Sequence, residues 1–253
     1  MKKVVFILLL LTPFCFSAYA EIDPPQTFSE AMRWYKEAAE DGNPRAQFLL
    51  GIMYHNGIRV GRDLVEAERW YRTAALKGHS SAQLSLAVIL HKGEIGESDP
   101  TAALYWYELA AKQGVTEAQY NLGVLYDRGE GVLADPKQAV FWYEKASSDG
   151  HSAAQNNLAI LYMRGEGVDL DLQRAHFLYG EAAKIGLVDA QYNLGVWYIQ
   201  AKGNEQDLVS AHRWFSIVAS GSNERLMEKA VRNISKIEEL MSKSELKRVR
   251  SSD

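Results

Sequence analysis

Cysteine is almost absent from this chain of 253 residues, in which Cys15 is the only example. A disulfide needs two cysteines, so no intramolecular disulfide can form, and a metal site built from several thiolates is excluded as well. The chain also lacks an excess of positive charge, because 28 Lys+Arg stand against 32 Asp+Glu for a formal net charge of −4. Proteins that bind nucleic acid usually carry a basic face. We therefore expect stability to come from packing, and we expect no nucleic-acid partner.

Long apolar runs are also missing. The unbroken run Val4–Leu11 is far shorter than the roughly 20 residues of a transmembrane helix. Two lysines precede this run, and Ala18-Tyr19-Ala20 follows it. This order is typical of a secretory signal peptide and predicts cleavage after Ala20, so that the mature chain begins at Glu21. An uncleaved membrane anchor is the alternative interpretation.

Export without cysteine has further consequences. Cys15 is a poor acceptor for lipid because the bulky Phe14 precedes it, where lipoprotein signals have a small residue. Without residues 1–20 the chain has no cysteine and a formal charge of −6. Hydrophobic residues make up 47% and charged residues 24%, which excludes disordered, collagenous and low-complexity classes. We expect a folded protein in the periplasm, with secretion as the alternative.

The rest of the chain is organised as a tandem repeat with a period of 36 residues, visible in four independent series. The series are Trp34, Trp70, Trp106, Trp142, Leu178 and Trp214; Ala46, Ala82, Ala118, Ala154 and Ala190, each followed by Gln; Gly42, Gly78, Gly114, Gly150 and Gly186; and Asp63, Asp99, Asp135, Asp171 and Asp207. Four series with one spacing indicate repeated copies of one structural unit.

Each unit is predicted to form two helices. In one unit Asp135 provides an N-cap, Pro136 suits the first helical position, and an apolar stripe runs from Ala139 to a C-terminal Gly150. A second stripe runs from Ala154 to Gly165, and a small residue beside each Leu lets two helices approach closely. Such a pair cannot bury its own stripe, so neighbouring pairs must stack. The predicted fold is an all-α solenoid of antiparallel helix pairs.

The segment Ala103 to Val132 shows the unit most fully, as Trp106-Tyr107, Ala110-Ala111, Gly114, Ala118-Gln119, Leu122-Gly123, Tyr126 and Gly129. This pattern resembles the Sel-one-like repeat (SLR) family, a relative of the tetratricopeptide repeats. The period of 36 favours this family, because true tetratricopeptide repeats have a period of 34. The resemblance extends over about residues 26 to 220. It implies about five and a half repeats and a protein that binds other proteins.

Both ends depart from the repeat. We expect a signal peptide at 1–20, a short extended lead at 21–26, a single SLR domain at 27–221, a capping helix at 222–242 and a frayed basic tail at 243–253. A capping element is needed because the last repeat would otherwise expose its apolar face. The basic tail leaves open a contact with a membrane or a partner.

Residues that carry chemistry are scarce. The six histidines form three pairs at equivalent repeat positions, so duplication explains them better than metal binding does: His55 and His91, His79 and His151, His176 and His212. Ser244-Glu245-Leu246-Lys247 matches the S-x-x-K motif of penicillin-interactive enzymes but has no S-D-N or K-T-G partner. A cysteine-rich secreted subgroup of the SLR family carries a β-lactamase label, yet this chain lacks the paired cysteines of that subgroup. We predict no catalytic residue, no cofactor and no metal site.

Three functions remain open. The first is a non-enzymatic scaffold in the bacterial envelope or outside the cell that binds a partner protein on its concave face. The second is a β-lactamase-like or penicillin-binding hydrolase, which hydrolysis of a chromogenic cephalosporin by the mature protein would reveal. The third is a structural subunit of a larger envelope, motility or secretion assembly. The partner would be an envelope protein or a host protein, and the sequence does not identify it. The sequence does not give the oligomeric state either.

A candidate binding surface lies on the helix that carries Trp and Tyr. The position two residues after its first Ala points away from the apolar stripe, since successive residues on a helix turn by about 100°. This position holds Arg33, Arg69, Tyr105, Phe141, Phe177 and Arg213. In related solenoids this helix face lines the concavity, and exposed aromatics in a line mark partner surfaces. The alternative is that these side chains pack between neighbouring helices and extend the core.

Overall fold

The computed structural model of the chain describes residues 28–200 and 207–250, which form thirteen α-helices and no strand. The helices are α1 (Phe28–Glu40), α2 (Pro44–Asn56), α3 (Leu64–Leu76), α4 (Ser80–Lys92), α5 (Pro100–Lys112), α6 (Thr116–Arg128), α7 (Pro136–Ser148), α8 (Ser152–Arg164), α9 (Leu172–Lys184), α10 (Val188–Gln200), α11 (Leu208–Ala219), α12 (Glu224–Leu240) and α13 (Lys243–Arg250). This confirms the predicted all-α class. The expected signal peptide at 1–20 and extended lead at 21–26 lie outside the described residues.

The repeated aspartates start the odd-numbered helices. Oδ1 of Asp135 accepts hydrogen bonds from the backbone N–H groups of Lys137 (3.0 Å) and Gln138 (3.2 Å), as an N-cap does. At the end of α6, Gly129 adopts a φ of +70° and closes the helix with a left-handed turn. The predicted Asp series thus marks where odd-numbered helices begin. The predicted Gly series follows their ends, as Gly150 with a φ of +83° does after α7, and Gly129 has the same role after an even-numbered helix.

From α1 to α12 each helix packs against its neighbours in the chain, and the closest packing joins each even-numbered helix from α2 to α10 to the odd-numbered helix that follows. This differs from the pairing expected from the sequence, which joined each odd-numbered helix to the next even-numbered one. The small residue beside each Leu explains the difference. A Cβ built on Gly51 would lie 2.5 Å from the ring of Tyr71 on the following helix, and one built on Gly123 would lie 2.6 Å from the ring of Tyr143. The missing side chain therefore makes room for the aromatic ring of its own partner helix.

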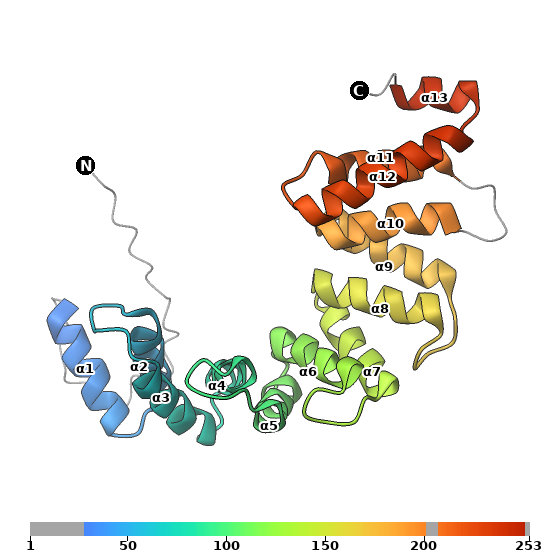
Figure 1. Cartoon of the computed structure of the whole chain (residues 1–253). Helices are drawn as coiled ribbons and strands as arrows, with labels where there is room; N and C mark the ends of the chain where they lie inside the picture. Colours follow the sequence, from blue (N-terminus) through green and yellow to red (C-terminus); the bar gives the residue numbers. More distant parts are fainter. Residues whose placement is uncertain (1–27, 201–206, 251–253) are drawn as a thin grey trace, which may run out of the picture.

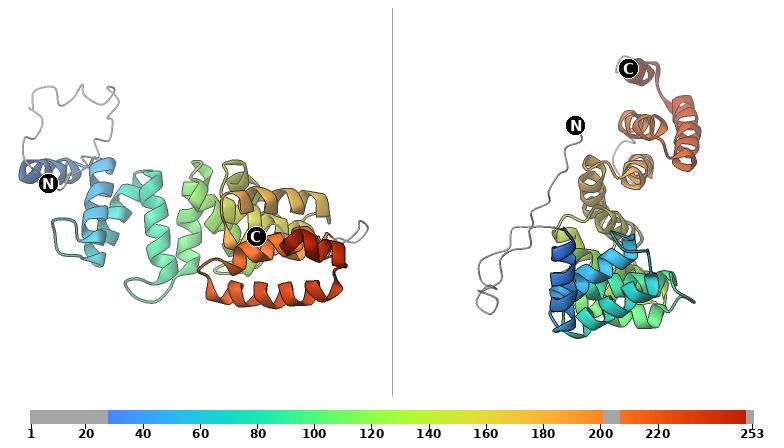
Figure 2. Two further views of the ribbon diagram at one scale, coloured as in Figure 1. Left: turned by 90° about the horizontal axis from the view of Figure 1, so that it is seen from above. Right: turned by 90° about the vertical axis from the view of Figure 1, so that its left-hand side faces the viewer.

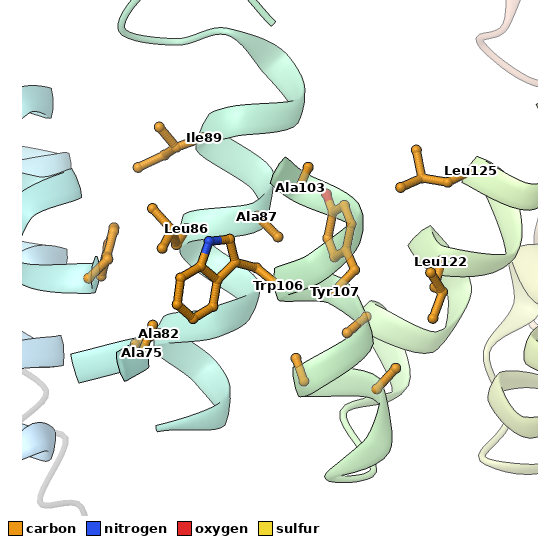
Figure 3. Packing of buried hydrophobic residues seen from close by; sticks show 14 of the residues in the cluster. Ala75, Ala82, Leu86, Ala87, Ile89, Ala103, Trp106, Tyr107, Leu122 and Leu125 are labelled. Atoms are coloured by element: carbon orange, nitrogen blue, oxygen red, sulfur yellow. The ribbon is translucent and has the colours of Figure 1, made fainter. Parts of the chain in front are cut away.

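The repeated tryptophan position fills the core within a closely packed pair and also faces the repeat before it, since Trp70 clusters with Leu50 of its partner α2 and with Ala39 of α1. Trp106 is buried and lies beside Leu86 of α4 (Figure 3). Trp70, Trp142 and Leu178 are buried at the equivalent positions, whereas Trp34 and Trp214 near the ends are half-buried. The apolar stripe that no pair can cover alone is therefore covered by the neighbouring repeats.

The repeated glutamines join adjacent repeats. In α2, α4 and α6 the side-chain amide donates to a carbonyl eight residues earlier, at the end of the preceding odd helix: Gln47 to Ala39 (2.9 Å), Gln83 to Ala75 (3.2 Å) and Gln119 to Ala111 (3.3 Å). These carbonyls belong to the last turn of a helix and have no partner within it. The period of 36 predicts the series of glutamines, but the hydrogen bond that each makes between repeats is visible only in the structure.

The stack as a whole is curved and twisted. Figure 1 shows it bending between its N-terminal half, at the lower left, and its C-terminal half, at the upper right. In the left view of Figure 2 the cyan and green helices stand upright while the orange and red helices lie flat, so the helix axes turn along the chain. No helix in the described part has the length and apolar character needed to cross a membrane.

The C-terminal end differs from expectation. The capping helix is present as α12, which buries Leu226, Ala230 and Ile237. The basic tail, expected to fray, forms helix α13, because Val249 is buried and Ser242 accepts from the backbone N–H of Glu245 as a cap. The end of the stack is thus closed by two helices.

Candidate functional site

The predicted surface forms a row across the odd-numbered helices, with one residue each from α1, α3, α5, α7, α9 and α11. We call it the outward row; it consists of Arg33, Arg69, Tyr105, Phe141, Phe177 and Arg213. All six side chains are exposed, and the three aromatic residues remain 58%, 46% and 54% exposed in chain order. Large apolar side chains with this exposure do not extend the core.

The aromatic rings of the row are supported by the core tryptophans. Tyr105 meets Trp106 edge-on with ring centroids 5.0 Å apart, and Phe141 meets Trp142 in the same way at 4.9 Å. These two exposed rings therefore each contact a buried tryptophan of a well-packed helix. Such preorganisation reduces the entropy lost when a partner binds.

Cations accompany the rings. Nζ of Lys145 lies 4.9 Å from the centroid of Phe141, and the guanidinium of Arg174 lies 5.5 Å from that of Phe177. Both distances are within the range of a cation–π contact. Arg69 lies in the same way 4.6 Å from the ring of Trp70, and it also pairs with Glu66 at 2.7 Å. The row is thus both aromatic and basic.

The row does not line the concavity, contrary to the expectation from the sequence. In Figure 1, α3, α5 and α7 lie on the outer side of the bend, and α2, α4 and α6 lie toward its inside. Described contacts between helices one repeat apart agree, since Asn193 of α10 reaches Asn156 of α8 (2.9 Å) and Asn233 of α12 reaches Tyr192 of α10 (3.1 Å). Elements on the inside of a curve are closer together, which permits such contacts. The part of the outward row on α3, α5 and α7 therefore lies on the convex side.

The inner side is largely occupied by its own side chains. Phe48 stacks on His79 with centroids 4.7 Å apart, and Tyr120 stacks on His151 at 4.4 Å. Asn156 is buried and holds the amide of Asn193. Asn193 recurs at the period of 36 with Asn121 and Asn157, but its acceptor Asn156 stands where the neighbouring repeats have tyrosine, so no repeated pattern signals this contact.

The histidines serve structural purposes in the described chain. Nδ1 of both His79 and His151 accepts the backbone N–H three residues later at 3.2 Å, so these two histidines are N-caps. His91 contacts Glu130 at 2.9 Å, and this bond lowers the pKa of the Glu130 carboxyl. Burial lowers the pKa of His176. In the described part of the chain, no three His, Cys, Asp or Glu side chains converge as metal ligands would.

The S-x-x-K motif lies on α13. Ser244 and Lys247 are both exposed, and the Ser244 hydroxyl is 2.9 Å from that of Ser242. A nucleophilic serine needs an adjacent base and a site that excludes water. Neither is found around Ser244 among the described residues.

Comparisons with known proteins agree with this architecture. The Sel1 repeat family model matches six successive segments, 24–43, 44–79, 80–115, 116–151, 152–187 and 188–223. Each full segment joins an even-numbered helix to the odd-numbered helix after it, which is the closely packed pair of the structure. No curated protein matches the chain.

Two solved structures are similar over most of the chain. A Sel1 repeat protein from Oxalobacter formigenes is 34% identical, with 77% of each chain covered and a TM-score of 0.63. The protein c5321, a protective antigen of uropathogenic Escherichia coli with an SLR fold, is 30% identical with a TM-score of 0.57. The match covers 87% of this chain and 54% of that antigen, so this chain spans about half the antigen's length. The chain belongs to the Sel1 repeat family.

Proposed function

We propose that this protein is an exported scaffold that holds a partner protein on its outward row. The observation that carries the proposal is the exposure of Tyr105, Phe141 and Phe177 in three consecutive repeats. Aromatic side chains that project from a rigid support are frequent binding hot spots. The inner side offers less free surface, because its aromatic and amide groups contact one another.

Family membership supports the general role. Sel1 repeat proteins are generally protein-interaction scaffolds and are typically not enzymes. A repeat stack presents an extended surface whose residues recur at a fixed spacing, which suits it to a long partner segment. We propose that this protein likewise acts by binding, and not by catalysis.

The first test replaces Phe141. A Phe141→Ala variant should keep its melting temperature within about one or two degrees of the parent, because removing an exposed contact changes folding free energy little. It should lose the partner that the parent captures from the envelope fraction. A photo-crosslinking residue at position 141 should trap that partner, whereas one at the exposed Lys229 of α12 should not. A markedly lower melting temperature for Phe141→Ala would show that the ring belongs to the core.

The second test concerns export. The lysine pair, the apolar run Val4–Leu11 and Ala18-Tyr19-Ala20 support cleavage after Ala20. N-terminal sequencing of the protein from the periplasm or the medium should therefore begin at Glu21. An intact Met1, or a lipid attached to Cys15, would contradict this proposal.

A further inference from the structure

On α7, two lysines flank Phe141, the member of the outward row that this helix carries. Lys137, Phe141 and Lys145 are spaced four residues apart, so they form one stripe along the exposed face of this helix. All three side chains are exposed, and Lys145 lies over the ring of Phe141. We call these three residues the α7 stripe.

The cations of the stripe have no acidic partner among the described residues. On neighbouring odd-numbered helices, Lys112 pairs with Glu108 at 3.0 Å and Lys184 pairs with Glu181 at 2.6 Å. Neither Lys137 nor Lys145 forms such an ion pair, although Glu144 precedes Lys145 directly. The hydroxyl of Tyr162 donates to Glu144 at 3.2 Å, which engages that carboxylate elsewhere. Two positive charges are thus left uncompensated in a chain whose net charge is negative.

An open hollow adjoins the N-terminal end of the stripe. Its lining includes Lys137, the apolar side chains of Val132, Leu133 and Ala134, and Asp135, whose carboxylate is engaged as the N-cap of α7. Leu133 is 89% exposed, which is unusual for a large apolar side chain. The hollow, Lys137, Phe141 and Lys145 follow one another along a line, so an extended chain can contact all of them.

We infer that the α7 stripe binds an acidic linear segment of the partner protein. Carboxylates of that segment meet Lys137 and Lys145, and an apolar side chain between them packs on Phe141. Charge complementarity argues for this occupant, because a basic or uncharged segment would leave the two lysines uncompensated. The inference rests on the proposed function and specifies the chemistry of the partner.

The test uses a synthetic probe. Lys137 and Lys145 are separated by eight rises of about 1.5 Å, or about 12 Å, which about four residues of an extended peptide span, so a probe of about ten residues covers the stripe with residues to spare at both ends. The probe is a fluorescein-labelled peptide of glutamates with one central tryptophan, and its binding to the purified protein is followed by fluorescence anisotropy. Lys137→Glu and Lys145→Glu should each weaken binding about tenfold or more, and Phe141→Ala should weaken it similarly.

Two controls define specificity. Lys229→Glu makes the same change in net charge on α12 and should leave the affinity unchanged. A peptide with glutamine in place of every glutamate should bind at least about tenfold more weakly, and raising NaCl should weaken the parent more than the double Lys137→Glu/Lys145→Glu variant. Equal binding of the glutamine peptide, or equal weakening by Lys229→Glu, would overturn the inference.

The outcome separates this inference from the proposed function. If the double lysine variant still captures the crosslinked partner while Phe141→Ala does not, the acidic-segment inference is wrong and the scaffold proposal stands. If Phe141→Ala captures the partner normally, the scaffold proposal is wrong. Dimerisation through the stripe in sedimentation experiments, or binding to anionic lipid vesicles in place of the peptide, would assign the surface to another occupant.

Discussion

At the scale of single residues, the N-cap position of the even-numbered helices shows how one role is filled by different chemistries. Asn43 caps α2 through its amide oxygen, which accepts the backbone N–H groups of Arg45 and Ala46. His79 caps α4 through Nδ1, which can accept only while the ring is neutral. Burial, and to a lesser degree the charge of Arg45, lowers the pKa of His79 below its ordinary value of 6.5. The histidine cap is therefore sensitive to acid, and the asparagine cap is not.

This difference predicts a pH dependence. The folded chain protonates His79 less readily than the unfolded chain does. The contribution of this cap to the free energy of unfolding is therefore complete above a pH of about 6.5 and is lost as the pH falls below it. His79→Asn should remove this part of the pH dependence, since asparagine is a good N-cap and does not titrate. The expected difference is up to about 1 kcal/mol, the usual contribution of a cap.

The measurement is urea unfolding of both proteins near pH 7.5 and near pH 5. The loss of unfolding free energy on acidification should be smaller in His79→Asn than in the parent. Glu130 and other carboxyls with lowered pKa values titrate at lower pH and affect both proteins alike. An identical loss in the two proteins would contradict the assignment of His79 as an acid-sensitive cap.

At the scale of helices, the sequence predicted where elements begin and end but not how they pair. Caps are local, so Asp135 and Gly129 could be recognised from their neighbours alone. Pairing depends on which ring covers which small residue, and the fit of Tyr143 over Gly123 is visible only in three dimensions. The outward row could be placed by helical geometry, but the position of its part on α3, α5 and α7 on the convex side depends on the curvature of the whole stack.

Adjacent residues on α5 give a prediction at this scale. Trp106 is 6% exposed and packs beside Leu86 of its partner helix α4, so Trp106→Ala should lower the free energy of unfolding by about 3–5 kcal/mol. Tyr105 is its exposed neighbour, and Tyr105→Ala should change it by no more than about 0.5 kcal/mol. Chemical denaturation of both variants checks the contrast. Similar losses in the two variants would mean that Tyr105 also contributes to the core.

At the scale of the whole molecule, the described chain is a one-dimensional stack. Each helix packs mainly against its neighbours in sequence, and α12 and α13 close the C-terminal end by contacts with α10 and α11. Stability in such an architecture is approximately a sum of repeat and interface contributions. Damage at one end should therefore remain local when the other repeats are stable enough by themselves.

Substitutions at the end and nearer the middle of the stack should therefore destabilise different sets of helices. Ile237 of α12 is buried against the last repeat, and Leu86 of α4 is buried in the N-terminal half. Each change to alanine should remove about 2–5 kcal/mol from its own interface. In native-state hydrogen exchange, Ile237→Ala should raise the exchange of α10 to α12 and leave α4 to α7 protected, since local opening follows local stability. Leu86→Ala should raise exchange in α3 to α5 first. Uniformly faster exchange over the whole chain in both variants would show instead that the stack unfolds as a single cooperative unit.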